Sequence, residues 1–276
     1  MSSDPNDRQK ILGDFLTWIR QNEAAGMEWF LAEGTAAATG PQPQPQPESQ
    51  SSPEDPFDEI SSQFVAQTLP LIQRQPARPQ TGPASLDKAA ALAALREEVL
   101  PCTACALHQS RQSVVFGSGS PDAEVVFVGE APGRDEDIQG QPFVGRSGQL
   151  LTKILAAIGY GRDEVFICNI LKCRPPNNRD PQADEVTACE PHLKRQLAIL
   201  NPRVICCLGR VAAQTLLGTD ASLKRLRETV HFYEGIPVMA TYHPAALLRN
   251  PGWKRETWND VRKLKALVDA LNSGDY

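Results

Sequence analysis

Polar and aromatic residues gather in this chain where its apolar runs end. The run 125–128 is followed by a segment, 129–151, that holds four acids within its first nine residues, then Phe143 and a predicted helix start at Ser147. A structural loop needs turn residues, but it does not need concentrated acids and an aromatic as well. Open α/β sheets bind their ligands in loops at the carboxyl ends of parallel strands. The segment therefore indicates one wall of a ligand site.

Three more places of this kind follow later apolar runs. They are Asn169 with Lys172, Gly209 with Arg210, and His243. Because parallel strands end at one edge of a sheet, we expect these residues to face one cleft. An aromatic face, an amide and a histidine together suit a nucleobase pocket, where they can stack, read a base edge and donate to a carbonyl. The structural alternatives are a turn-forming Asn, a structural His and a core aromatic.

Four of the seven cysteines have spacings typical of a metal centre. Cys102 and Cys105 form a C-x2-C pair, whereas Cys173 and Cys189 are separated by 15 residues. Four thiolates suit either a tetrahedral zinc ion or a [4Fe-4S] cluster. Zinc ribbons carry two C-x2-C pairs, so the wide second pair favours the cluster. Scattered buried thiols are the alternative.

The elements that must position these residues alternate between strand and helix. We expect strands at 124–128, 165–171, 204–208 and 237–241, and helices at 86–99, 147–158, 181–200, 210–217 and 253–271. Continuously apolar strands are typical of parallel sheets covered on both faces. The pattern predicts an α/β fold, a three-layer α/β/α sandwich with a central, mostly parallel four-stranded sheet. The other cysteines, Cys168, Cys206 and Cys207, lie inside apolar runs and are expected in its core.

The N-terminal third has a different character. Apolar residues at helical spacing predict an amphipathic helix within residues 1–34, and ten of the 23 prolines fall between Pro41 and Pro83. We interpret residues 35–84 as a Pro/Gln-rich disordered linker and residues 85–276 as the folded domain. The N-terminal helix is a candidate for docking a protein partner, or it folds back on the body.

Composition sets loose limits on function. The net charge is −5, but residues 1–90 hold 12 acids and 6 bases while the remainder holds 21 acids and 22 bases. Charge therefore neither supports nor excludes DNA binding. We find no signal-peptide pattern and no apolar run as long as a membrane span, so we expect a cytoplasmic monomer without disulfides.

Several separated motifs then resemble one known family. The segments GEAPG-x2-ED, PFVG-x-SG-x-LL and HPAALL, with Asn169 and the four spaced cysteines, closely resemble the family 4 uracil-DNA glycosylases. These base-excision repair enzymes carry a [4Fe-4S] cluster within an α/β/α fold. The resemblance covers residues 86–271. It implies an enzyme that removes uracil from DNA by hydrolysing the N-glycosidic bond and leaves an abasic site. The rival is an iron–sulfur protein that binds nucleic acid or carries electrons without glycosylase activity.

The resemblance also implies a role for each motif residue. Phe143 would stack on flipped uracil, Asn169 would read its O4 and N3 edge, and His243 would donate to O2. Gly129 and Ala131 would line the pocket, with Glu130, Glu136 and Asn178 as the remaining catalytic contributors. Leu247 or Leu248 would wedge into the duplex, and the phosphate contacts would be Arg146, Ser147, Lys172 and Arg249. The cluster ligands would be Cys102, Cys105, Cys173 and Cys189.

Two departures from related families bear on mechanism. Ala131 stands where the family 1 enzymes carry an aspartate thought to activate water, so the nearest carboxylate is Glu130. A related group traps uracil-DNA covalently through a histidine in an insertion after the third cysteine. The segment after Cys173 has no histidine near it and no insertion, which favours turnover.

Overall fold

The structure, a computed structural model, describes residues 56–75 and 85–274. The helix predicted within residues 1–34 lies outside this part of the chain. Among the described helices, none combines the length and apolar character that a membrane crossing requires.

A six-stranded sheet forms the centre of the molecule. Its strands are β1 (Ser118–Gly119), β2 (Val125–Gly129), β3 (Phe166–Asn169), β4 (Val204–Leu208), β5 (His231–Tyr233) and β6 (Ile236–Thr241), in the order β1-β3-β2-β4-β6-β5. The four central strands are parallel, which confirms the predicted sheet. The two edge strands are antiparallel and were not predicted, because two or three residues are too few to show a pattern.

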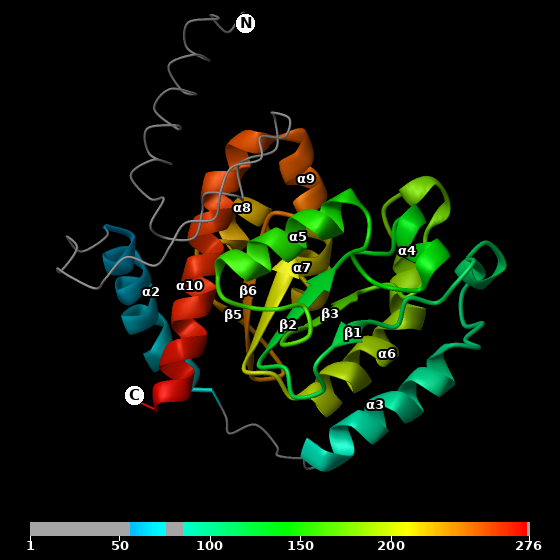
Figure 1. Cartoon of the computed structure of the whole chain (residues 1–276), viewed down its shortest axis with the longest axis horizontal. Coiled ribbons are helices and arrows are strands. Elements are labelled where there is room, and N and C mark those ends of the chain that lie inside the picture. Colours follow the sequence, from blue (N-terminus) through cyan, green and yellow to red (C-terminus); the bar gives the residue numbers. More distant parts are fainter. Residues whose placement is uncertain (1–55, 76–84, 275–276) are drawn as a thin grey trace, which may run out of the picture.

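Helices cover both faces of the sheet (Figure 1). They are α2 (Pro56–Gln73), α3 (Ser85–Val99), α4 (Arg134–Gln139), α5 (Arg146–Ala157), α6 (Ala183–Leu200), α7 (Arg210–Leu217), α8 (Leu223–Leu226), α9 (Pro244–Arg249) and α10 (Lys254–Ser273). Short 3-10 turns lie at Ala106–Gln109, Pro176–Asn178 and Pro251–Trp253. Alternate strand residues point to opposite faces. Val126 and Cys207 thus pack with α3, α6 and α7, while Phe127 and Cys206 pack with α5 and α10.

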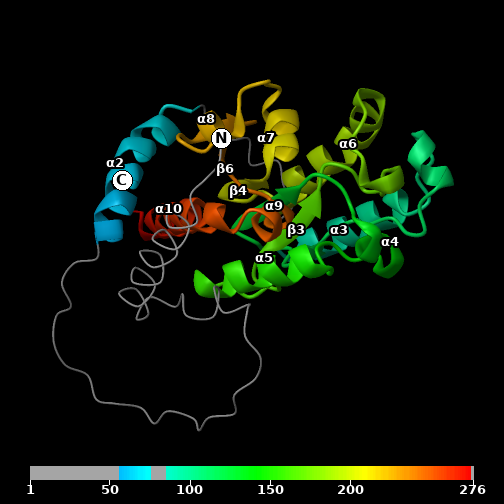
Figure 2. The same ribbon diagram turned by 90° about the horizontal axis from the view of Figure 1, so that it is seen from above.

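Helix α2 corrects the predicted linker. Residues 56–73 were included in a disordered stretch at 35–84, but they form a helix that lies beside α10 (Figure 2). Phe64 of this helix is 8% exposed and joins the core layer of α5 and α10. The prolines that surround the helix masked its apolar positions in the sequence. The three core cysteines, Cys168, Cys206 and Cys207, are at most 2% exposed, as predicted.

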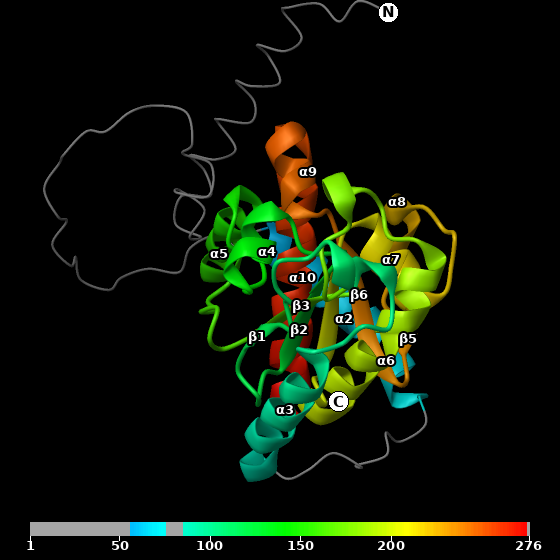
Figure 3. The ribbon, with the colours of Figure 1, turned by 90° about the vertical axis from the view of Figure 1, so that its right-hand side faces the viewer.

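The carboxyl ends of the parallel strands meet at one end of the molecule. Gly129 ends β2, Asn169 ends β3, Gly209 follows β4, and His243 follows β6 by two residues. Figure 3 shows α9 and α4 toward this end and α3 at the other. The predicted convergence of the four strand-end segments is confirmed by this topology.

Candidate active site

A cavity of about 380 Å³ opens at the carboxyl ends of the strands. Its lining includes nine of the residues predicted from sequence. These are Glu130, Ala131, Glu136, Phe143, Ser147, Asn169, Asn178, His243 and Arg249. The cavity is therefore assembled from loops that lie more than 100 residues apart in the chain.

Gly129, which was predicted to line the pocket, is not in the lining but contacts two side chains that are. A Cβ at this position would lie 2.6 Å from Phe143 Cζ and closer still to Asn169 Oδ1. No real Cβ atom tolerates such approaches, so only glycine fits here. The bare backbone lets the aromatic ring and the amide approach each other.

Phe143 is held in an unusual backbone conformation. Its φ is 53°, a left-handed value that is rare for a bulky residue, and its side chain is 5% exposed. Gly148 of α5 packs directly on its carbonyl group, where any side chain would overlap it. The ring centroid lies 5.4 Å from that of His243, with the planes tilted by 32°. Such strain in a non-glycine residue is typical of functional sites.

Glu136 holds this loop together. One carboxylate oxygen accepts from Val144 N at 2.9 Å and Gly145 N at 3.0 Å, and the other accepts from Gly133 N at 3.1 Å. Both oxygens are thus engaged by backbone on either side of Phe143. This geometry favours a positioning role over the catalytic role predicted for Glu136.

Asn169 presents a free acceptor. The residue is 1% exposed, yet no group among the described residues donates to its Oδ1. A buried polar atom without a partner is costly and rare, so its partner is expected to come from the cavity, as water or as a ligand.

His243 is fixed in one tautomer. Its Nδ1 accepts a hydrogen bond from Ala245 N at 3.1 Å, so in the neutral ring the proton lies on Nε2. Burial, with a smaller effect of Arg249, lowers the pKa of His243 to about 4. At neutral pH the ring is therefore an uncharged donor. Gly209 (φ 96°) permits this placement, because a Cβ there would lie 2.9 Å from His243 Cβ.

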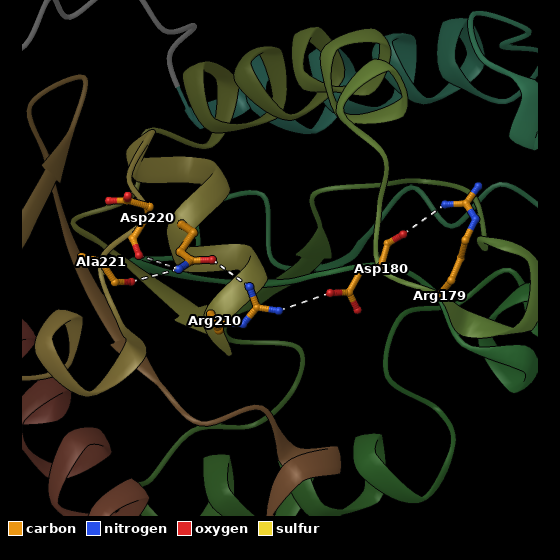
Figure 4. A network of polar contacts seen from close by, with 6 residues as sticks. Arg179, Asp180, Arg210, Asp220 and Ala221 are labelled. Carbon is orange, nitrogen blue, oxygen red and sulfur yellow. Dashed lines mark hydrogen bonds and ion pairs between the residues drawn. The ribbon is translucent and has the colours of Figure 1, made fainter.

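Glu130 and Asp180 also line the cavity, whereas Arg210, which was expected to face it, pairs with Asp180 outside the lining. Burial raises the pKa of Glu130, Asp180 raises it further, and Arg210 opposes the shift. Arg210 Nη2 donates to Asp180 Oδ2 at 3.2 Å, and Arg179 Nη1 donates to the Asp180 carbonyl at 3.0 Å (Figure 4). Because Arg210 is the first residue of α7, its ion pair with Asp180 ties the segment after β3 to the start of that helix.

Two predicted DNA contacts are wrong. Lys172 is 1% exposed and donates to the Asn169 carbonyl, so it cannot reach a phosphate. Leu247 is 0% exposed and packs in a core cluster with Trp258, which leaves the half-buried Leu248 as the wedge candidate. Arg146 and Arg249 are exposed, and Ser147 is half-buried in the first turn of α5.

Other residues of the lining were missed by the sequence analysis. They are Pro132, Gly133, Pro175, Arg179, Asp180 and Ala245. Two of these, Pro132 and Gly133, lie within the GEAPG motif, so the sequence did hold a signal for them. Asp180 carried no signal, because a lone acid in a polar loop is ordinary. Asn178 lines the cavity with φ 53°, and its Oδ1 accepts from Arg174 Nε at 2.7 Å.

The four spaced cysteines converge on a second, smaller cavity. Cys102, Cys105, Cys173 and Cys189 line it together, with Arg111, Lys172 and His192 among its other residues. Three polar groups contact the sulfurs: Arg111 Nη1 donates to Cys173 at 3.3 Å, Lys172 N donates to Cys189 at 3.3 Å, and His192 Nε2 lies 3.4 Å from Cys102. Such contacts stabilise thiolate ligands.

In the described residues, no three His, Cys, Asp or Glu side chains are placed so that they could hold one metal ion. A zinc ion requires its sulfur ligands at about 2.3 Å. Four thiolates around one cavity are also the ligand set of a [4Fe-4S] cluster.

Comparison with known proteins identifies the family. Residues 116–262 match the model of the uracil DNA glycosylase superfamily. A type-4 uracil-DNA glycosylase of Archaeoglobus fulgidus is 47% identical over 178 residues, covering 62% of this chain and 89% of the relative. The type-4 enzymes of Sulfurisphaera tokodaii and Thermotoga maritima are 45% and 44% identical, covering 63% and 62% of this chain and 83% and 92% of the relatives. The chain belongs to the uracil-DNA glycosylase superfamily, within its type-4 group.

Proposed function

We propose that this chain removes uracil from DNA by hydrolysing the N-glycosidic bond, leaving an abasic site in base-excision repair. The observation that carries this conclusion is the buried Asn169 Oδ1, which has no donor among the described residues and shares a cavity with Phe143 and the neutral His243. The rival reading, an iron–sulfur protein without this activity, gives no reason for an amide acceptor at that place.

Asn169 would select uracil by the polarity of its amide. The oxygen accepts a hydrogen bond from uracil N3–H, and the NH2 group donates to O4. Cytosine has an unprotonated N3 and an amino group at C4, so it presents the opposite pattern. Sites built for such hydrogen bonds reject the wrong partner strongly, because their buried groups are left unpaired.

Phe143 and His243 would act on the ring and on O2. Phe143 offers a face for stacking, which is worth about 1–3 kcal/mol for a base. Cleavage leaves negative charge on uracil, and the Nε2–H of His243 would donate to O2 as that charge develops. Because its pKa is about 4, the ring is neutral before it donates. Removing one such donor typically costs about 10²–10³ in rate.

The attacking water would be held by the first residues of the segment after β2. Glu130 is half-buried at the cavity wall and its raised pKa brings it closer to the range of a general base. Ala131 contributes only backbone there. Asn178 would support this side of the site.

DNA would approach along the rim of the cavity. Arg146 and Arg249 would contact phosphates with Ser147 at the start of α5, and Leu248 would fill the space left by the flipped base. The substrate is DNA, single- or double-stranded, and we expect the enzyme to act as a monomer. A protein partner for the N-terminal helix stays a prediction.

The four spaced cysteines fit a [4Fe-4S] cluster. They share one cavity, their sulfurs receive hydrogen bonds, and in the sequence the single C-x2-C pair with its wide second pair favours a cluster over zinc. The bound cluster would supply a rigid covalent link among the helix α3 end, the segment after β3 and α6. Elemental analysis should give iron rather than zinc, with a broad absorption near about 400 nm.

Purified protein and a uracil-containing oligonucleotide test the function. We expect an abasic product from the wild-type chain, and at least about a 10²-fold slower reaction from His243→Ala. The matched control is His231→Ala, whose histidine lies on the edge strand β5 away from the cavity. A wild-type protein with its cluster bound and no abasic product would overturn the proposal.

A further inference from the structure

Lys172 is a buried cation that the reaction does not use. Its side chain is 1% exposed, and its Nζ donates to the Asn169 carbonyl at 2.8 Å. Among the described residues no carboxylate lies within ion-pair distance of this ammonium group. A neutral carbonyl compensates a buried charge poorly, and an unpaired buried charge is strongly destabilising. Something else must offset the charge of Lys172.

The nearest source of negative charge is the cysteine cavity. Lys172 lines this cavity, and its backbone N–H donates to Cys189 Sγ at 3.3 Å. An iron–sulfur cluster held by four thiolates carries net negative charge. Arg111 also faces the cavity, but it is half-buried, so water shares the cost of its charge. Lys172 is almost fully buried, so contact with water does not reduce the cost of burying its charge.

Lys172 also contacts the residue that reads the base. Its ammonium group holds the carbonyl of Asn169, the last residue of β3. One side chain thus spans from the cysteine cavity to the backbone of the base-reading amide. Lys172 is therefore a direct physical link between the cysteine cavity and the backbone of Asn169.

We propose that Lys172 is the internal counter-charge of the cluster and couples cluster binding to the placement of Asn169. The first half stands on the burial and neighbours of Lys172. The second half rests on the proposed function, because it assigns Asn169 to uracil.

Cluster loss in the presence of an iron chelator tests the first half. The holoprotein is followed by its visible absorption, with Lys172→Met compared with wild type. Lys194→Met is the control, because Lys194 lies on the same helix as Cys189 but is 47% exposed and paired with Glu190. Losing a group just outside the metal ligands costs about 10–100-fold in metal binding. We expect cluster loss from Lys172→Met to be at least about tenfold faster, and an unchanged rate would overturn the proposal.

Lys172→Arg guards against a simple folding defect. It keeps the charge, so its cluster loss should stay within about threefold of wild type. Equally fast loss from the Arg and Met variants, with wild-type far-UV circular dichroism, would show that charge is irrelevant and would overturn the proposal.

Inhibition by free uracil tests the second half. With the cluster loaded, Lys172→Met should raise the inhibition constant of uracil about tenfold, whereas Lys194→Met should leave it unchanged. Equal constants would remove the coupling to Asn169. Chelator rates need no glycosylase activity, so an inactive wild-type protein would refute the proposed function without obscuring the counter-charge result.

Discussion

Gly129→Ala is the sharpest test of the cavity geometry. The change adds one methyl group and leaves every side chain proposed to bind uracil chemically intact. The new Cβ would lie 2.6 Å from Phe143 Cζ, and ordinary carbon–carbon contact lies near about 3.6 Å. The ring must therefore move by about 1 Å, and the Asn169 amide must move with it. A misplacement of about 1 Å can cost about 10²-fold in rate.

That factor corresponds to about 2.7 kcal/mol of transition-state free energy. The assay is kcat/KM on a uracil-containing oligonucleotide, with thermal unfolding followed in parallel. Gly252→Ala is the matched control, because apart from the adjoining residues of the chain no described atom lies within 4 Å of its new Cβ. A Gly129→Ala enzyme with kcat/KM within about threefold of wild type would show that the ring and amide need not be placed this closely.

Four more predictions address single groups. Asn169→Asp should narrow the preference for uracil over cytosine in paired cleavage assays, because a carboxylate cannot donate to O4. Glu136→Gln should lower the free energy of unfolding in urea by about 1–3 kcal/mol, since its NH2 group cannot accept from backbone N–H groups. His243 stays neutral in the folded protein down to about pH 4, whereas in the unfolded chain it binds a proton near its ordinary pKa of about 6.5. The free energy of unfolding should therefore fall as the pH is lowered from about 6.5 to 4, and it should fall less in His243→Gln. Phe64→Ala should destabilise the domain by about 3–5 kcal/mol, whereas Ile60→Ala, on the exposed side of α2, should change little.

The sequence predicted the parts of the fold that have a strong period. The strand at 204–208 and the helix at 210–217 match β4 and α7 residue for residue, because an unbroken apolar run and a clear helical repeat specify them. Strands β1 and β5 have two and three residues, and tertiary pairing alone creates them. Helix α2 was not predicted, because the sequence on either side of it is rich in proline. Its apolar face can be recognised as buried only once the helix is packed against α10.

The sequence predicted which residues belong to the site, but not the directions in which their side chains point. Parallel topology brings Asn169 and His243 to one end of the sheet, and the loop that Glu136 holds brings Phe143 there. Whether a side chain then faces the cavity depends on the turn that follows. Lys172 sits three residues past Asn169, and the chain turns its ammonium group back onto the strand end. Leu247 lies on the inner side of α9, a short helix that the sequence did not reveal.

The amide oxygen of Asn169 bears directly on selectivity. No described residue donates to it, so only water in the cavity or a ligand can satisfy it, and a ligand that displaced the water without donating would leave it unpaired at a cost of about 1–3 kcal/mol. Uracil N3–H would satisfy it. Cytosine has no proton at N3 and would add a second lone pair facing the first. Discrimination would then arise mainly from repulsion and an unmet acceptor in the wrong complex, rather than from an exceptionally strong bond in the right one.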